Sequence, residues 1–343
     1  MHKTKTTVLI ATTLLACGIL ASLDADARGR NRNVQRGTHH GSVSVERDNA
    51  RGESQRQRNW ERDGQGNASG STSHSVTGAN GGSGEREGSY YRNADGSAGH
   101  QGSVSATNAN GGTLDSSGGF TRDAEGNVDG SRSTTATNAN GGTYTGSTTV
   151  NDGQVTHTGT VTTANGGTTQ VDRDYSRDAE GNLSGSRTTT VTGANGGSYT
   201  GSTTVNDGQM THTASRTTAN GGTAQVDGSY SRDADGNISG GRSMTATGAN
   251  GGTYSGSTTV SDGQLTHTGT KTGANGGTVQ ADGSYSRGED GKVDGGRTTS
   301  ATGPNGATYS GSTTVTDGQV THTGTCTNAD GVVVDCPQRN DGN

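Results

Sequence analysis

The sequence predicts an all-β protein, a series of tandem antiparallel β-hairpin repeats that form an extended meander or solenoid-like sheet. Thr and Val alternate along regular segments, as is typical of strands. Turn signals recur at fixed intervals and define a repeat of 55 residues. Only 23% of residues are hydrophobic while 63 are Gly, which excludes a conventional globular core.

The chain is expected to have four parts. These are a signal peptide at 1–27, an Arg-rich disordered segment at 28–65, tandem hairpin repeats at 66–325, and a C-terminal cap with a short tail at 326–343.

The first residues are typical of a secretory signal. Lys3 and Lys5 precede a largely apolar run over residues 7–23, and Ala25 and Ala27 provide a small-residue cleavage site. A secreted, periplasmic or cell-surface protein is therefore expected. The tetrapeptide ending at Cys17 resembles a bacterial lipobox, so lipid anchoring at Cys17 is the alternative.

Residues 28–65 contain nine Arg against five acidic residues and show no hydrophobic periodicity. We expect a solvated, disordered linker. The alternative is a segment that contacts an anionic polysaccharide, phosphate groups or the acidic repeats of another copy. Nucleic acid is not an expected partner of an exported chain.

The tetrad Ala-Asn-Gly-Gly marks the repeat. Its spacing is 30 residues at first and then alternates between 25 and 30, so the mature unit contains two unequal hairpins. Intact copies begin at Ala79, Ala109, Ala139, Ala164, Ala194, Ala219, Ala249 and Ala274.

The shorter hairpin is clearest at 143–162. Asp152-Gly153 is a strong signal for a two-residue type I′ turn. This turn places Val150 opposite Val155. One face then carries Tyr144, Val150, Val155, His157 and Val161, and the other is almost wholly Thr and Ser.

The longer hairpin, at 168–192, is predicted to turn through a three-residue loop with Gly181 in the left-handed conformation. That register places Tyr175 opposite Gly185, where the ring covers exposed backbone. The recurring tyrosines are Tyr144, Tyr175, Tyr199, Tyr230, Tyr254, Tyr285 and Tyr309.

Two sets of residues are candidate cation ligands. Histidines recur every 55 residues; imidazole binds metals, but each unit offers only one, so a space-filling strand residue is the competing interpretation. They are His157, His212, His267 and His322. Acidic turn residues are weak Ca²⁺ candidates, or simply solubilising turn chemistry. They are Asp152, Asp178, Glu180, Asp233 and Asp235.

Cys326 and Cys336 flank a turn near the C-terminus. Two Cys in an exported chain are expected to form a disulfide, and free thiols are the alternative.

The strand Thr156, Thr158, Thr160 and Thr162 resembles the Thr-x-Thr arrays of ice-binding β-solenoids. In composition, residues 66–343 are similar to secreted Gly/Asn/Thr-rich repeat proteins of bacterial surfaces, including functional amyloids. This resemblance implies a structural protein of the surface or extracellular matrix that self-associates through strand edges. The alternative is a monomeric, non-catalytic binding module for a cation, a glycan or ice. No catalytic site and no cofactor are expected, because Ser, His and Asp recur everywhere at the repeat spacing, whereas a catalytic site would normally break the repeat.

Overall fold

The computed structural model describes residues 29–178, 180–233, 235–288 and 291–336, and every element within these ranges is a β-strand. The chain divides into two compact units, Met1–Gly166 and Gly167–Asn343. The predicted signal peptide and Cys17 lie outside the described residues. Among those that are described, no helix is long and apolar enough to span a membrane.

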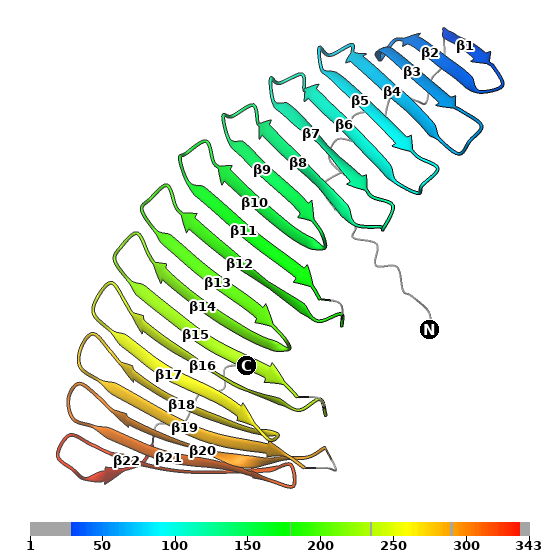
Figure 1. Ribbon diagram of the computed structural model, residues 1–343. Helices are drawn as coiled ribbons and strands as arrows, with labels where there is room; N and C mark the ends of the chain where they lie inside the picture. The colour runs from blue at the N-terminus through cyan, green and yellow to red at the C-terminus, as the bar shows by residue number, and fades with distance from the viewer. Residues whose placement is uncertain (1–28, 179, 234, 289–290, 337–343) are drawn as a thin grey trace. The chain divides into compact units, whose positions relative to one another are not determined.

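In unit 1 each strand pairs antiparallel with the next and is joined to it by a short turn (Figure 1). Its strands are β1 (Arg30–Arg36), β2 (His40–Asn49), β3 (Gly52–Arg62), β4 (Ala68–Gly78), β5 (Ser83–Arg92), β6 (Ala98–Thr107), β7 (Thr113–Arg122), β8 (Val128–Thr137), β9 (Thr143–Asn151) and β10 (Gln154–Thr162).

Unit 2 has the same antiparallel order. Its strands are β11 (Thr168–Arg177), β12 (Leu183–Thr192), β13 (Ser198–Asn206), β14 (Gln209–Thr217), β15 (Thr223–Arg232), β16 (Ile238–Thr247), β17 (Thr253–Ser261), β18 (Gln264–Thr272), β19 (Thr278–Arg287), β20 (Val293–Thr302), β21 (Thr308–Thr316), β22 (Gln319–Thr327) and β23 (Val333–Val334). The predicted all-β meander of hairpins is confirmed.

The Arg-rich segment 28–65 was predicted to be disordered, and this prediction is wrong for residues 30–62. Strands β1, β2 and β3 occupy most of it, and β3 pairs along its whole length with β4. In this segment the alternation that is typical of a strand is formed by charged residues and not by apolar ones. Along β3, Arg56 and Arg58 occupy one set of alternate positions, whereas Glu53 and Glu61 occupy the other.

The three-residue loops form as predicted. The Asp178 N–H donates to the Asn182 carbonyl (3.2 Å), the Gly181 N–H donates to the Asp178 carbonyl (3.1 Å), and Gly181 has φ of 94°. The Ala-Asn-Gly-Gly turns have the same geometry. At one of them the Gly193 N–H donates to the Gly197 carbonyl (2.7 Å). Both turns are therefore tight enough to set the register of the strands that they join.

The shorter hairpins turn through two residues, both with positive φ. Asp152 has φ of 42° and Gly153 has φ of 79°, as a type I′ turn requires. The register that follows is the predicted one, with Val150 opposite Val155 and Tyr144 opposite Val161. In the longer hairpin, Tyr175 lies opposite Gly185 as expected.

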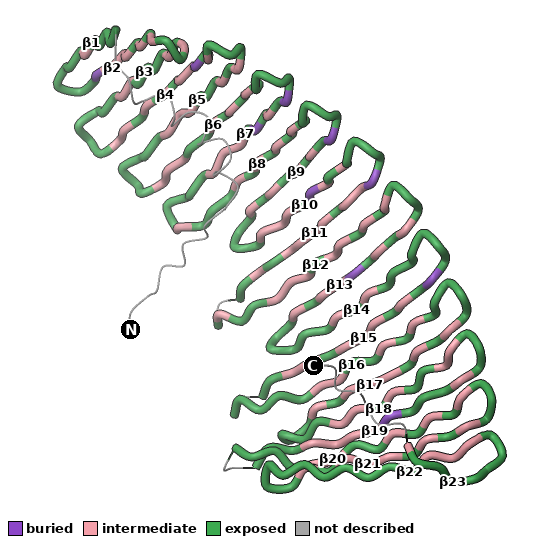
Figure 2. The backbone as a smooth tube through the Cα atoms, turned by 180° about the vertical axis from the view of Figure 1, so that it is seen from behind, coloured by how far each residue is buried: buried purple, intermediate pink, exposed green. Residues whose placement is uncertain are grey.

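The described residues contain almost no apolar core. Val76 and Ala281 are the only buried hydrophobic side chains among them, 4% and 8% exposed. Most strand positions are half-buried or exposed, and the turns are largely exposed (Figure 2). Each unit is thus a single layer whose strands are held mainly by their ladder hydrogen bonds.

Aromatic rings cover the glycine backbone at several ladder positions. A Cβ added at Gly185 would lie 2.8 Å from Cδ1 of Tyr175, and one added at Gly295 would lie 2.7 Å from Cδ1 of Tyr285. In the shorter hairpins the tyrosine covers a glycine of its own strand, as Tyr144 covers Gly146. A residue with a Cβ atom would collide with the ring at these positions, so only glycine fits beneath it.

The substitution Gly185→Ala should destabilise the β11–β12 hairpin by about 1–3 kcal/mol, because the new methyl group collides with the Tyr175 ring and with backbone. Gly269→Ala in β18 is the matched control, since its nearest neighbour would be His267 Nε2 at an ordinary 3.4 Å. Hydrogen exchange of the hairpin amides measures the difference. Equal protection in the two variants would contradict the ring-over-glycine register.

Candidate functional site

The two faces of each unit differ in chemistry. Neighbouring side chains along a strand point to opposite faces, and cross-strand partners share a face. One ladder row of unit 1 runs through Trp60, Gly70, Tyr90, His100 and Phe120. We call the face carrying this row the aromatic face of unit 1, and the opposite face the hydroxyl face.

Unit 2 is organised in the same way. Its aromatic face is defined by the row that starts at Tyr175 on β11 and ends at Val320 on β22. This row contains Tyr175, Gly185, Val205, Met210, Tyr230, Gly240, Val260, Leu265, Tyr285, Gly295, Val315 and Val320.

Charge is sorted between the faces of unit 1. Every Arg within its strands lies on the aromatic face, and every Asp or Glu within its strands lies on the hydroxyl face. The cations are Arg30, Arg32, Arg36, Arg47, Arg56, Arg58, Arg62, Arg86, Arg92, Arg122 and Arg132. The acids are Glu46, Asp48, Glu53, Glu61, Glu85, Glu87, Asp115 and Asp129.

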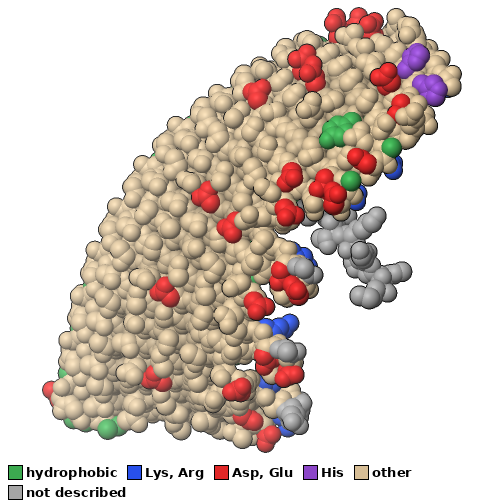
Figure 3. Space-filling model, in the orientation of Figure 1, with side chains coloured by type: hydrophobic (Ala, Val, Ile, Leu, Met, Phe, Trp, Pro, Cys, Tyr) green, Lys and Arg blue, Asp and Glu red, His purple; other side chains and the backbone are tan. Residues whose placement is uncertain are grey.

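The same rule holds for the strands of unit 2. On its aromatic face lie Arg173, Arg177, Arg187, Arg216, Arg232, Arg242, Lys271, Arg287 and Arg297. On its hydroxyl face lie Asp172, Asp174, Asp227, Asp282 and Asp294. In the surface that Figure 3 shows, Asp and Glu are scattered while Lys and Arg appear only at the rim.

The arginines of the aromatic face affect the pKa of His74, which lies on the same face. The pKa of His74 is lowered, first because the ring is desolvated and then because cations surround it. These cations are Arg56, Arg47 and Arg86. Because its strands carry arginines and no acids on this side, the aromatic face of unit 1 is electropositive.

The recurring histidines are tied to threonines across the hairpin. Nδ1 of His157 lies 2.8 Å from Oγ1 of Thr148, and the same bond joins His212 to Thr203. His267 and His322 repeat it with Thr258 and Thr313. Successive histidines of unit 2 are four strands apart, about 19 Å. They are too far apart to share a metal ion, and no strand carboxylate shares their face to orient them.

The acidic loops use their carboxylates internally. In the loop of Asp178, Oδ1 accepts the Asn182 N–H (2.8 Å) and Oδ2 accepts the Asn182 side-chain amide (2.9 Å). Asp233 forms the same pair of bonds with Asn237. Among the described residues no three His, Cys, Asp or Glu side chains form a group that could hold a metal ion. Asp152, Glu180 and Asp235 are likewise in no such group, so calcium binding at these turns stays a prediction without a formed site.

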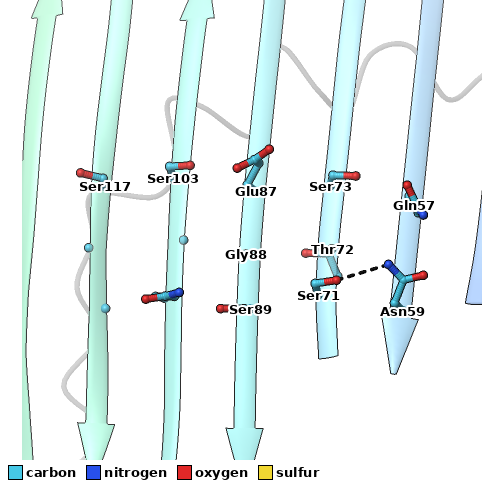
Figure 4. Close-up of a pocket in the computed structure, with 14 residues that line it drawn as sticks. Gln57, Asn59, Ser71, Thr72, Ser73, Glu87, Gly88, Ser89, Ser103 and Ser117 are labelled. Carbon is cyan, nitrogen blue, oxygen red and sulfur yellow. Dashed lines mark hydrogen bonds between the residues drawn. The ribbon is translucent and has the colours of Figure 1, made fainter. Parts of the chain in front are cut away.

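The hydroxyl face of unit 1 contains a groove of about 720 Å³. Its walls are amides and hydroxyls from β3 to β7, including Gln57, Ser103 and Ser117, and Glu87 is the one charged side chain in its lining (Figure 4). Asn59 donates to Ser71 within it (3.4 Å). With a single carboxylate and no neighbouring base, the groove offers polar contacts rather than acid–base chemistry.

The hydroxyl face of unit 2 carries a row of threonines beside the Ala-Asn-Gly-Gly turns. Ser198 is its only departure from Thr. The row is Thr168, Thr192, Ser198, Thr217, Thr223, Thr247, Thr253, Thr272, Thr278, Thr302, Thr308 and Thr327. Thr pairs across the shorter hairpins also bond through their hydroxyls, as Thr149 does with Thr156.

The terminal strands leave backbone groups available. The N-terminal strand β1 pairs with β2 and presents Arg30, Arg32 and Arg36 on one side. At the other terminus, β23 pairs only with Cys326 and Thr327 of β22. The predicted disulfide is present between Cys326 and Cys336, which follows β23 by two residues.

No match to a known protein was found. Family models, curated proteins and solved structures were each searched, with the same result.

The separation of charge between faces is the feature that the sequence analysis missed. Its signal was the aromatic-x-Arg triplet before each longer loop, as in Tyr175-Ser176-Arg177 and Tyr230-Ser231-Arg232. In a strand such a spacing places the ring and the guanidinium on one face.

Acid should weaken the longer hairpins. Hydrogen bonds from Asn182 hold the pKa of Asp178 below its ordinary value. A carboxyl group whose pKa is lower in the folded state than in the unfolded state stabilises the fold at pH values above its unfolded-state pKa. This stabilisation is lost as the pH falls through its folded-state pKa. Hydrogen exchange of the β11–β12 amides between about pH 5 and pH 2 should show a loss of protection that is smaller in Asp178→Asn.

Asp152→Asn in a two-residue turn is the control, because Asn also suits that turn. It should leave the pH dependence of the β11–β12 amides unchanged. Identical pH profiles for the wild type and Asp178→Asn would refute the role of this carboxylate.

Proposed function

We propose that the chain is an exported structural protein of the cell surface or extracellular matrix, and that copies associate through the edges of their sheets. The observation that carries this proposal is that the described strands form single-layer units whose terminal strands differ in chemistry. An unpaired strand edge is a template for another strand. Nothing in this role requires catalysis, and we propose none.

The two edges favour head-to-tail contact. Two β1 edges brought together would oppose arginines with arginines, including Arg30 and Arg32. The C-terminal edge, β22, has no Lys, Arg, Asp or Glu, and Asp330 and Asp335 lie beside it. A heterologous contact of this kind repeats from copy to copy, and it produces a filament when the rotation between copies does not close a ring.

The edges are also protected against premature pairing. Charged side chains on an edge strand oppose association, which fits the arginines of β1. At the other end, the disulfide between Cys326 and Cys336 holds β23 against the last residues of β22. Such protection suits a chain that stays soluble during export and assembles afterwards.

Val320→Pro tests the proposal. Val320 lies next to the hydrogen-bonded pair that closes the β21–β22 turn, so its own N–H points away from β21 towards the open edge. Proline removes this donor without removing a ladder bond to β21. Wild-type protein should sediment with a mass that rises with concentration, and Val320→Pro should remain monomeric.

Val320→Ala, which keeps the outward donor, should associate like the wild type. If the wild type remains monomeric at every concentration, edge association is wrong and the non-catalytic binding module becomes the better proposal. If Val320→Pro associates as strongly as the wild type, assembly uses another surface.

A further inference from the structure

The aromatic face of unit 1 carries a row of three rings, of which Trp60 and Tyr90 lean over glycines of the preceding strands and Phe120 over a glycine of the following strand. Trp60, Tyr90 and Phe120 occupy equivalent ladder positions on β3, β5 and β7. Strands two apart in a sheet are about 9.4–9.8 Å apart. All three residues are half-buried, so part of each remains accessible to solvent.

An arginine accompanies each ring. Arg62, Arg92 and Arg122 follow the rings by two residues on the same strands, and therefore lie on the same face. All three are exposed, and within the described ranges none of them forms a salt bridge. Their donors are available to a ligand, and a guanidinium binds a carboxylate through two parallel hydrogen bonds.

The surrounding face reinforces this chemistry. No strand acid lies on it, because the acidic side chains of these strands point to the hydroxyl face. The lowered pKa of His74, which shares the face, reflects its cations as well as burial. The positive electrostatic potential of this face attracts a polyanion, whereas it does not attract a neutral partner and repels a cationic one.

We propose that this double row of rings and arginines binds a linear acidic polysaccharide. The apolar face of a sugar ring stacks on each aromatic ring, and a carboxylate of the same chain lies between the guanidinium donors. Trp60 and Tyr90 both lean over the preceding strand, so their spacing is close to the length of two sugar residues in an extended β-linked chain. A polymer with one uronate in every disaccharide therefore matches these two rings and the arginines beside them. The site does not depend on edge association, which is a separate property.

The test is titration of the purified full chain with hyaluronan oligosaccharides, which carry one carboxylate per disaccharide. Trp60 is the single tryptophan, so its fluorescence reports directly on occupancy of the row. Binding should change this fluorescence and weaken with added salt. A neutral β-linked glucan oligosaccharide should bind at least about tenfold more weakly, because it forms no charge-assisted bonds with the arginines.

Adjacent tyrosines provide the matched variants. Tyr90 lies on the aromatic face and Tyr91 on the hydroxyl face, each over a glycine. Tyr90→Ala should weaken binding about five- to tenfold, as expected for loss of one stacked ring, and Tyr91→Ala should leave it unchanged. Arg92→Gln should weaken binding more than Arg51→Gln, since Arg51 lies in a turn.

Far-UV circular dichroism of each variant establishes that the sheet is intact. Equal losses for Tyr90→Ala and Tyr91→Ala would overturn the proposal. So would the absence of any fluorescence change with hyaluronan, or equally tight binding of a single-stranded DNA oligonucleotide of the same charge, which would show a general polyanion surface. Sedimentation without polysaccharide tests edge association independently, so either proposal can fail alone.

Discussion

The structure depends on the hydrogen-bond ladder between neighbouring strands, because little else holds these strands together. The described residues bury almost no apolar side chains, so the usual hydrophobic driving force is small. Each ladder bond contributes little on its own, and the turns make the ladders cooperative by fixing register. Positive φ at Asp152 and Gly153, or at Gly181, is thus as important to this fold as a packed core is to a globular domain.

A sheet without a core leaves both faces free, and the alternation of side chains then decides what each face does. Rings placed over glycines cover part of the aromatic face and leave arginines beside them exposed. Thr, Ser and acids occupy the opposite face, where Thr149 and Thr156 bond across the strands. Because the pattern repeats, each unit offers extended surfaces of one chemistry rather than a single pocket. Recognition by many weak, equivalent contacts suits polymers and other copies of the chain.

The repeat, the turns, the disulfide and the register could all be predicted from the sequence, because each has a local sequence signal. Asp-Gly turns fixed the pairing of Val150 with Val155, and the loop of Asp178 fixed that of Tyr175 with Gly185. Residues 30–62 were missed because their strand period is carried by Arg and Glu, which also characterise disordered segments. The sorting of charge between faces was missed for a related reason, since it becomes visible only when alternation is followed across all paired strands.

The central claim is that ladder hydrogen bonds, with little apolar burial, hold the strands of each unit together. Hydrogen exchange of the soluble, monomeric protein tests this claim most directly. The amides of the interior strands, such as β4 to β8 in unit 1, should be protected along their full length. Protection should fall at β1 and at Val320, His322 and Gly324 of β22, whose N–H groups point to the open edge. Uniformly rapid exchange throughout β4 to β8, with protection gained only on assembly, would contradict this account.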